Sequence, residues 1–179
     1  MELMRKSWDE HFLAIAQEVA SMGTCARRQV GCVLVDDRRV ILSTGFNGVP
    51  PKWDHCRGTA EEGARPCPGA NAEPGTGLDL CYANHAEINA LLHCPDVMRA
   101  HTCYCTASPC ISCVKALLCT GVCRIVFCEE YPHPEAKELW TRASLFILQR
   151  RGPISDHRTW EKWDPQLNET VLLGSSGLR

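Results

Sequence analysis

The chain has 179 residues, a formal net charge of −2 and 13 cysteines. This length predicts one domain that buries roughly 70% of its unfolded surface without disulfides. The near-neutral charge predicts no nucleic-acid-binding surface, and the absence of roughly 18 consecutive apolar residues predicts no membrane span. Because the chain starts without an apolar leader, we expect a cytoplasmic protein whose cysteines bind metal or are buried.

The first half of the chain predicts a helix, a hairpin and a long irregular segment. Apolar residues recur at helical spacing over residues 8–23, which indicates an amphipathic helix. Residues 30–35 and 40–46 have the composition of two paired strands, and Cys32 is expected in the core. Residues 57–80 contain eight glycines or prolines among 24 residues and show no hydrophobic periodicity. This segment therefore needs an anchor of its own.

The second half predicts helices that alternate with strands. We expect helices over residues 84–93, 110–120 and 134–143, and strands over residues 101–106, 124–128 and 145–148. Together with the first half, this order predicts an α/β fold, a three-layer α/β/α sandwich around a single five-stranded mixed sheet. We expect a catalytic domain over residues 1–152 and a partly ordered C-terminal extension over residues 153–179, with loose final residues.

Two short motifs carry potential metal chemistry. His85-Ala86-Glu87 follows Asn84, and Ser108-Pro109-Cys110-Ile111-Ser112-Cys113 follows the strand at 101–106. Asn84 and Ser108 are good N-cap residues, so both motifs are expected at helix starts, where thiolates are stabilised. His85, Cys110 and Cys113 are the donor set of a catalytic zinc that keeps one position for water. Glu87 is expected to shuttle protons without binding the metal.

Two other cysteines are expected to be structural. Cys103 and Cys105 alternate with Tyr104 on the strand at 101–106, so they face the same side. Two side chains at this spacing on a strand are poorly placed to reach the same zinc ion, and cysteine is common in buried cores.

Several motifs resemble those of deoxycytidylate deaminases, in the same order. They are the segments 23–31 and 45–50, the pair His55-Cys56, His85-Ala86-Glu87 and Ser108-Pro109-Cys110-x-x-Cys113. The resemblance covers about residues 7–148 and is to bacterial and phage members of the cytidine deaminase-like superfamily. It implies the α/β sandwich already predicted and a zinc-dependent hydrolysis of dCMP to dUMP and ammonia.

The resemblance also implies roles for individual residues. Arg27 is expected to hold the 5′-phosphate of the nucleotide, and Asn47 to contact a sugar hydroxyl. Ala86, Ser108 and Tyr131 are further substrate-binding residues that the resemblance implies.

Some members of the resembled family carry a second metal site and an allosteric nucleotide site. The cysteines that frame the irregular segment could form a closed structural zinc site. They are Cys25, Cys56, Cys67 and Cys81, and His55 is an alternative to one of them. The resemblance further implies control by dCTP and dTTP, with magnesium accompanying the allosteric nucleotide, and a homohexamer.

Three alternative functions remain open at this point. A tRNA adenosine deaminase shares His-Ala-Glu and Pro-Cys-x-x-Cys, but a tRNA-binding protein should be basic. A deaminase acting on dCTP or on a modified dCMP, such as 5-methyl-dCMP, would use the same motifs. A non-catalytic zinc scaffold is the third alternative, and Glu87 argues against it because a closed structural site has no use for an unliganded carboxylate.

Overall fold

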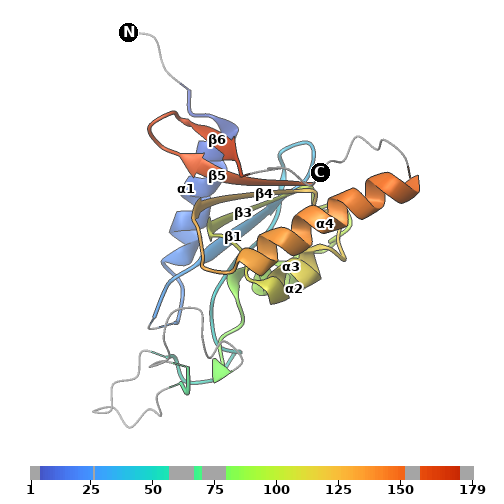
Figure 1. Cartoon of the computed structure of the whole chain (residues 1–179). Coiled ribbons are helices and arrows are strands. Elements are labelled where there is room, and N and C mark those ends of the chain that lie inside the picture. The colour runs from blue at the N-terminus through green and yellow to red at the C-terminus, as the bar shows by residue number, and fades with distance from the viewer. Residues whose placement is uncertain (1–4, 26, 57–66, 70–79, 152–157, 174–179) are drawn as a thin grey trace.

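The structure is a computed structural model that describes residues 5–25, 27–56, 67–69, 80–151 and 158–173. Its elements in chain order are α1 (Trp8–Ala20), β1 (Gly31–Val35), β2 (Ile41–Phe46), α2 (Ala86–His93), β3 (Thr102–Ala107), α3 (Ile111–Leu117), β4 (Arg124–Glu129), α4 (Pro134–Arg151), β5 (Thr159–Asp164) and β6 (Glu169–Leu172). The six strands form one sheet in the order β2-β1-β3-β4-β5-β6 (Figure 1). The β3–β4 and β4–β5 pairs are parallel and the other pairs are antiparallel.

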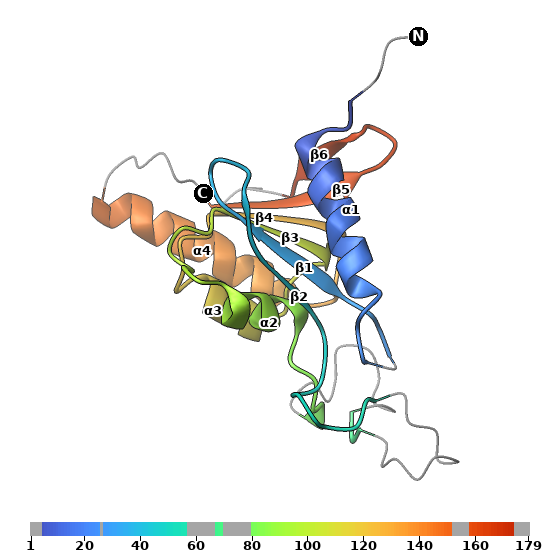
Figure 2. The ribbon, with the colours of Figure 1, turned by 180° about the vertical axis from the view of Figure 1, so that it is seen from behind.

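Helices cover both faces of this mixed sheet. Figure 2 shows α1 on one face and α2, α3 and α4 on the other. On the α1 side, Phe12 packs with Val33 and Tyr104, and on the opposite side Ala90 and Trp140 pack with Phe127. All five residues of β1 are buried, because this inner strand is covered from both sides. The predicted three-layer α/β/α sandwich is confirmed, with six strands where five were predicted.

The strand predicted at residues 145–148 is wrong, because these residues belong to α4. A run of four apolar residues is compatible with either a buried helix or a strand. A parallel crossover from β4 to the next strand needs a dozen or more residues, usually a helix, and α4 supplies it with 18 residues. The strand that follows is β5, at Thr159–Asp164.

The segment expected to be a C-terminal extension contributes β5 and β6 to the same sheet. A half-buried arginine holds this hairpin to the rest of the domain. The guanidinium of Arg124 on β4 donates to Asp9 of α1 at 2.7 Å and to Glu161 of β5 at 2.9 Å. Thr170 of β6 donates to the same Glu161 carboxylate at 2.7 Å. The hairpin is therefore part of the same domain and not a separate extension.

Some predictions fall on residues outside the described part of the chain. The predicted domain boundary near residue 152, the final residues 174–179 and most of the segment 57–80 lie there. Within the described part, no helix is long and apolar enough to cross a membrane.

The start of α2 is fixed against the edge of the sheet by close backbone contact. A Cβ atom on Gly45 of β2 would lie 2.3 Å from the carbonyl oxygen of Ala86 and 2.3 Å from the backbone nitrogen of Ala90. Ser43 donates its hydroxyl to the Ala90 carbonyl at 2.7 Å, and Asn89 donates its amide to the Phe46 carbonyl at 2.8 Å. Because Gly45 has no side chain, α2 lies directly on β2.

Candidate active site

The starts of α2 and α3 bring one imidazole and two thiols together. His85 is the N-cap residue of α2 and Cys110 the N-cap residue of α3, and neither side chain caps its helix by a hydrogen bond. The His85 Nδ1 atom lies 3.3 Å from the Cys110 Sγ atom and 3.4 Å from the Cys113 Sγ atom, and the two sulfurs are 3.6 Å apart. The three predicted ligand atoms are therefore close enough to bind a single ion.

These distances fit a tetrahedral zinc ion. With Zn–S near 2.3 Å and Zn–N near 2.05 Å, tetrahedral angles place two ligand sulfurs about 3.8 Å apart and a sulfur and a nitrogen about 3.6 Å apart. The observed separations fall about 0.2–0.3 Å below these values. Three protein donors leave the fourth position of a tetrahedral ion free, as in catalytic zinc sites.

The electrostatics of the two thiols favour metal binding. Hydrogen bonds from the Cys113 thiol and from His85 stabilise a thiolate at Cys110 and lower its pKa to about 3. Cys113 then holds the proton of the pair, and its own pKa is raised. A bound divalent ion replaces that proton, because metal ligation requires the thiolate form.

Glu87 lies in the first turn of α2 and is only 3% exposed. Burial raises the pKa of its carboxyl to about 7, while the charge of His85 opposes the rise. The residue lines a cavity of ≈ 250 Å³ together with His85 and Cys110. A carboxyl beside the donor set, facing a cavity, is placed to exchange protons with a bound molecule.

All five predicted substrate-binding residues line the same cavity: Arg27, Asn47, Ala86, Ser108 and Tyr131. The Ser108 hydroxyl accepts a hydrogen bond from the backbone N–H of Tyr131 at 2.7 Å, which ties the residues after β3 to those after β4. The Tyr131 ring stacks on His133 with ring centres 5.5 Å apart. These contacts give the cavity an aromatic wall whose backbone is fixed.

Asn47 has backbone partners at both ends of its side chain. Its Oδ1 accepts from the Val30 N–H at 2.8 Å, and its Nδ2 donates to the Arg28 carbonyl at 2.6 Å. The amide therefore holds the segment with the two arginines in place. Within the described part of the chain, the other N–H of the Asn47 amide is left for a ligand, so the predicted sugar contact stays a prediction.

Arg28 is a cavity residue that the sequence analysis missed. Its guanidinium is ion-paired with Glu129 at the end of β4, whereas Arg27 donates to the Gly69 carbonyl at 3.0 Å. Adjacent arginines point to different sides in most backbone conformations. The sequence signal for Arg28 was its position beside Arg27, and that signal does not say which of the two faces a ligand.

The predicted second metal site is assembled in part. Sulfur atoms of Cys56, Cys67 and Cys81 lie within 4.8 Å of one another, and Cys67 Sγ is 3.7 Å from Cys81 Sγ. Cys25 does not join this close group, and it lines the active-site cavity together with Cys81. The His55 side chain is exposed and is not in the group.

An α/β sandwich with one imidazole, two thiols and a buried carboxylate around a cavity defines the class of zinc-dependent nucleobase deaminases. The chain belongs to the cytidine and deoxycytidylate deaminase family, whose zinc-binding region matches residues 6–129. Zinc is therefore its metal.

Named relatives agree with this assignment. The chain is 38% identical over 130 residues to the deoxycytidylate deaminase of Mycobacterium phage D29, a match covering 72% of this chain and 99% of the phage protein. It is 37% identical over 131 residues to the deoxycytidylate deaminase of Saccharomyces cerevisiae, covering 72% of this chain but only 40% of the yeast protein. The dCMP deaminase of cyanophage S-TIM5, solved in complex with dCMP and dUMP, shares the fold with a TM-score of 0.57 at 22% identity, covering 78% of this chain and 94% of that one.

Proposed function

We propose that the chain hydrolyses dCMP to dUMP and ammonia, with Glu87 as its proton shuttle. The observation that carries this proposal is the arrangement of His85, Cys110 and Cys113 around one point, with the buried Glu87 carboxyl beside them at the same cavity. The phage and yeast relatives named deoxycytidylate deaminase support the choice of substrate.

The chemistry follows from these four side chains. Zinc held by the imidazole and the two thiolates supplies Lewis acidity, which lowers the pKa of a water molecule toward about 7. The water oxygen adds to C4 of the cytosine while Glu87 accepts a proton from it. Glu87 passes one water proton to N3 and the other to the exocyclic amine. The C4–N bond then breaks, and ammonia leaves.

The cavity walls can select a deoxynucleotide. In this proposal Arg27 holds the 5′-phosphate by a charge-assisted hydrogen bond, with Arg28 beside it as a second cation. Asn47 offers its remaining N–H to the sugar, and Tyr131 supplies an aromatic surface. Ala86 and Ser108 are small residues next to the donor set, which leaves space for a flat base.

We also propose a second, structural zinc bound by Cys56, Cys67 and Cys81. Three thiols within 4.8 Å support it, and Cys25 or His55 would have to move to complete a closed tetrahedral site. Arg27 donates to Gly69, two residues after Cys67. An ion at this site would therefore also hold the residue proposed to bind phosphate.

The remaining proposals rest on the family resemblance. They are a homohexamer, control by dCTP and dTTP with magnesium accompanying the nucleotide, and a location in the cytoplasm.

The test is a Glu87→Gln variant, because the amide keeps the shape and removes the proton shuttle. We expect zinc to stay bound while release of ammonia from dCMP falls by about 10²- to 10⁴-fold. Glu138→Gln, at an exposed position of α4, is the matched control and should keep full activity. A Glu87→Gln protein with more than about a tenth of wild-type turnover would contradict the role of Glu87. Wild-type rates on dCMP, CMP, dCTP, deoxycytidine and 5-methyl-dCMP establish the substrate.

A further inference from the structure

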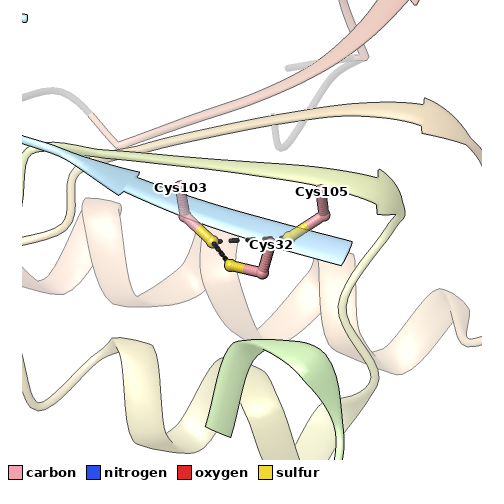
Figure 3. Close-up of side chains that lie close together, drawn as sticks. All are labelled: Cys32, Cys103 and Cys105. Atoms are coloured by element: carbon pink, nitrogen blue, oxygen red, sulfur yellow. Dashed lines mark hydrogen bonds between the residues drawn. The ribbon is translucent and has the colours of Figure 1, made fainter. Parts of the chain in front are cut away.

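A second group of three thiols lies in the core, behind the active site. Cys32 on β1 is the cross-strand partner of Cys105 on β3, and Cys103 lies two residues before Cys105 on the same face of the sheet. The Cys103 sulfur is 3.5 Å from the Cys32 sulfur and 3.5 Å from the Cys105 sulfur (Figure 3). All three residues are 0% exposed. The antiparallel register of β1 and β3 therefore gathers three thiols that the sequence keeps far apart.

Two of the three sulfur separations match those of ligands around a single ion, and all three sulfurs lie within 4.8 Å of one another. The separation of 3.5 Å is within 0.1 Å of the 3.6 Å between Cys110 and Cys113, the two thiols of the zinc donor set. The group has sulfur donors only, and the described residues add no fourth histidine, cysteine or carboxylate ligand to it. Structural zinc sites have four ligands, so three thiols alone do not complete one. Soft thiolate ligands instead favour ions that bind sulfur strongly.

The net charge of the complex indicates which kind of sulfur-binding ion this site can hold. A monovalent ion bound by three thiolates forms a complex of charge −2, and a divalent ion forms one of charge −1. Both would be costly in a fully buried apolar site. Only a trivalent centre gives a neutral complex with three thiolates.

We propose that Cys32, Cys103 and Cys105 form a buried binding site for a trivalent thiophile of the arsenous acid class. Arsenous acid, As(OH)₃, condenses with three thiols to As(SR)₃ and three water molecules. Three As–S bonds form as three As–O and three S–H bonds break, and each thiol proton leaves on a hydroxide. Arsenic remains trivalent, so no oxidant or reductant is required.

A ligand bound at this site would affect the geometry of the active site through α2. The three thiols share one core cluster with Ala86 and Ala90 on α2, the helix that also carries Glu87. Drawing three sulfurs onto one centre changes the surface on which these alanines pack. Because the site is buried, arsenite should enter slowly, when the core opens locally.

The experiment uses zinc-loaded protein, in which the other metal-binding thiols are occupied. Sodium arsenite is added to the folded protein and, in a parallel sample, during refolding with zinc, after which unbound arsenite is removed. Elemental analysis then gives arsenic and zinc per chain, and X-ray absorption at the arsenic edge counts the sulfur ligands. We expect one arsenic per chain with three sulfur neighbours and an unchanged zinc content.

Matched variants locate the arsenic. Cys32→Ala and Cys105→Ala should both lose it, and two variants are used so that the test stands if one fails to fold. Cys123→Ala, which removes another buried thiol, should keep it. Absence of arsenic after both loading routes would overturn the proposal. So would arsenic that persists in Cys32→Ala, or arsenic that rises only as zinc is lost.

The effect on catalysis rests on the proposed deaminase function and is measured separately. Turnover of dCMP should fall in proportion to the arsenic content, while Cys32→Ala treated in the same way should keep its untreated rate. Full turnover at one arsenic per chain would refute the link between the three thiols and Glu87. Absence of turnover before any arsenite is added would instead refute the proposed function.

Discussion

Replacing Gly45 by alanine tests whether the contact between β2 and α2 positions the catalytic groups. The added Cβ would lie 2.3 Å from the Ala86 carbonyl oxygen, whereas ordinary contact begins at 3.4 Å, so the helix must retreat by the difference, about 1.1 Å. Overpacking of this kind costs about 1–3 kcal/mol of unfolding free energy. Because His85 and Glu87 flank Ala86, we also expect kcat/KM on dCMP to fall by about 10²-fold, the typical cost of a misplacement near 1 Å.

The assay compares melting temperature, zinc content and kcat/KM, with the rates measured well below the melting transition. Gly121→Ala is the matched control, since its Cβ would lie 2.1 Å from the Met98 carbonyl oxygen in the turn before β4, among residues that do not line the cavity. It should lose comparable stability and keep its activity. A Gly45→Ala protein with the wild-type melting temperature and a rate within about twofold of wild type would refute the argument.

Three further predictions concern other parts of the molecule. Arg27→Ala should lower kcat/KM on dCMP by about 10- to 100-fold and barely change turnover of deoxycytidine, which has no phosphate; equal losses on both substrates would make this arginine structural. Cys56→Ala should lose one equivalent of zinc and melt at a lower temperature, whereas an unchanged zinc content would argue against the second site. Arg124→Gln should lower the unfolding free energy by about 2–3 kcal/mol at pH 7, less than for a fully buried pair because Asp9 and Glu161 keep some exposure. Burial raises the pKa of both carboxyls, but Arg124 lowers it together with hydrogen bonds from Tyr104 to Asp9 and from Thr170 to Glu161, so the net shift is downward. The stability that these two carboxylates contribute is complete above their unfolded pKa values near 4 and is lost as the pH falls through their lower folded pKa values. The unfolding free energies of wild type and Arg124→Gln should therefore converge below about pH 4. A difference that stays constant with pH would contradict this.

The sequence predicts which side chains come together at the candidate metal site better than it predicts the helix starts that hold them. His85, Cys110 and Cys113 follow from residue type and spacing alone, and the structure brings them together. The predicted N-caps were wrong by one and two residues, since the caps are His85 and Cys110 instead of Asn84 and Ser108. Ser108 uses its hydroxyl to hold Tyr131, a partner that local sequence does not show.

Contacts between distant segments explain the other differences. β5 contains Glu161 and Lys162, and such charges in a C-terminal segment suggest a solvated tail. The strand forms because Arg124, 37 positions earlier, neutralises Glu161 inside the fold. Likewise, Cys103 and Cys105 were expected to be structural residues, and only the register of β1 against β3 shows that Cys32 joins them.

The two N-cap positions that we propose as metal ligands carry a cost in intrinsic stability. A serine, aspartate or asparagine at an N-cap position typically adds about 1 kcal/mol of helix stability through a side-chain hydrogen bond. The side chains of His85 and Cys110 make no such hydrogen bond. A Cys110→Ser protein should therefore melt at a higher temperature than wild type when both are free of zinc, although it binds the metal poorly. His85 and Cys110 are suited to catalysis, whereas a capping residue at either position would make the apoprotein more stable. Activity and thermal stability therefore oppose each other at the starts of α2 and α3.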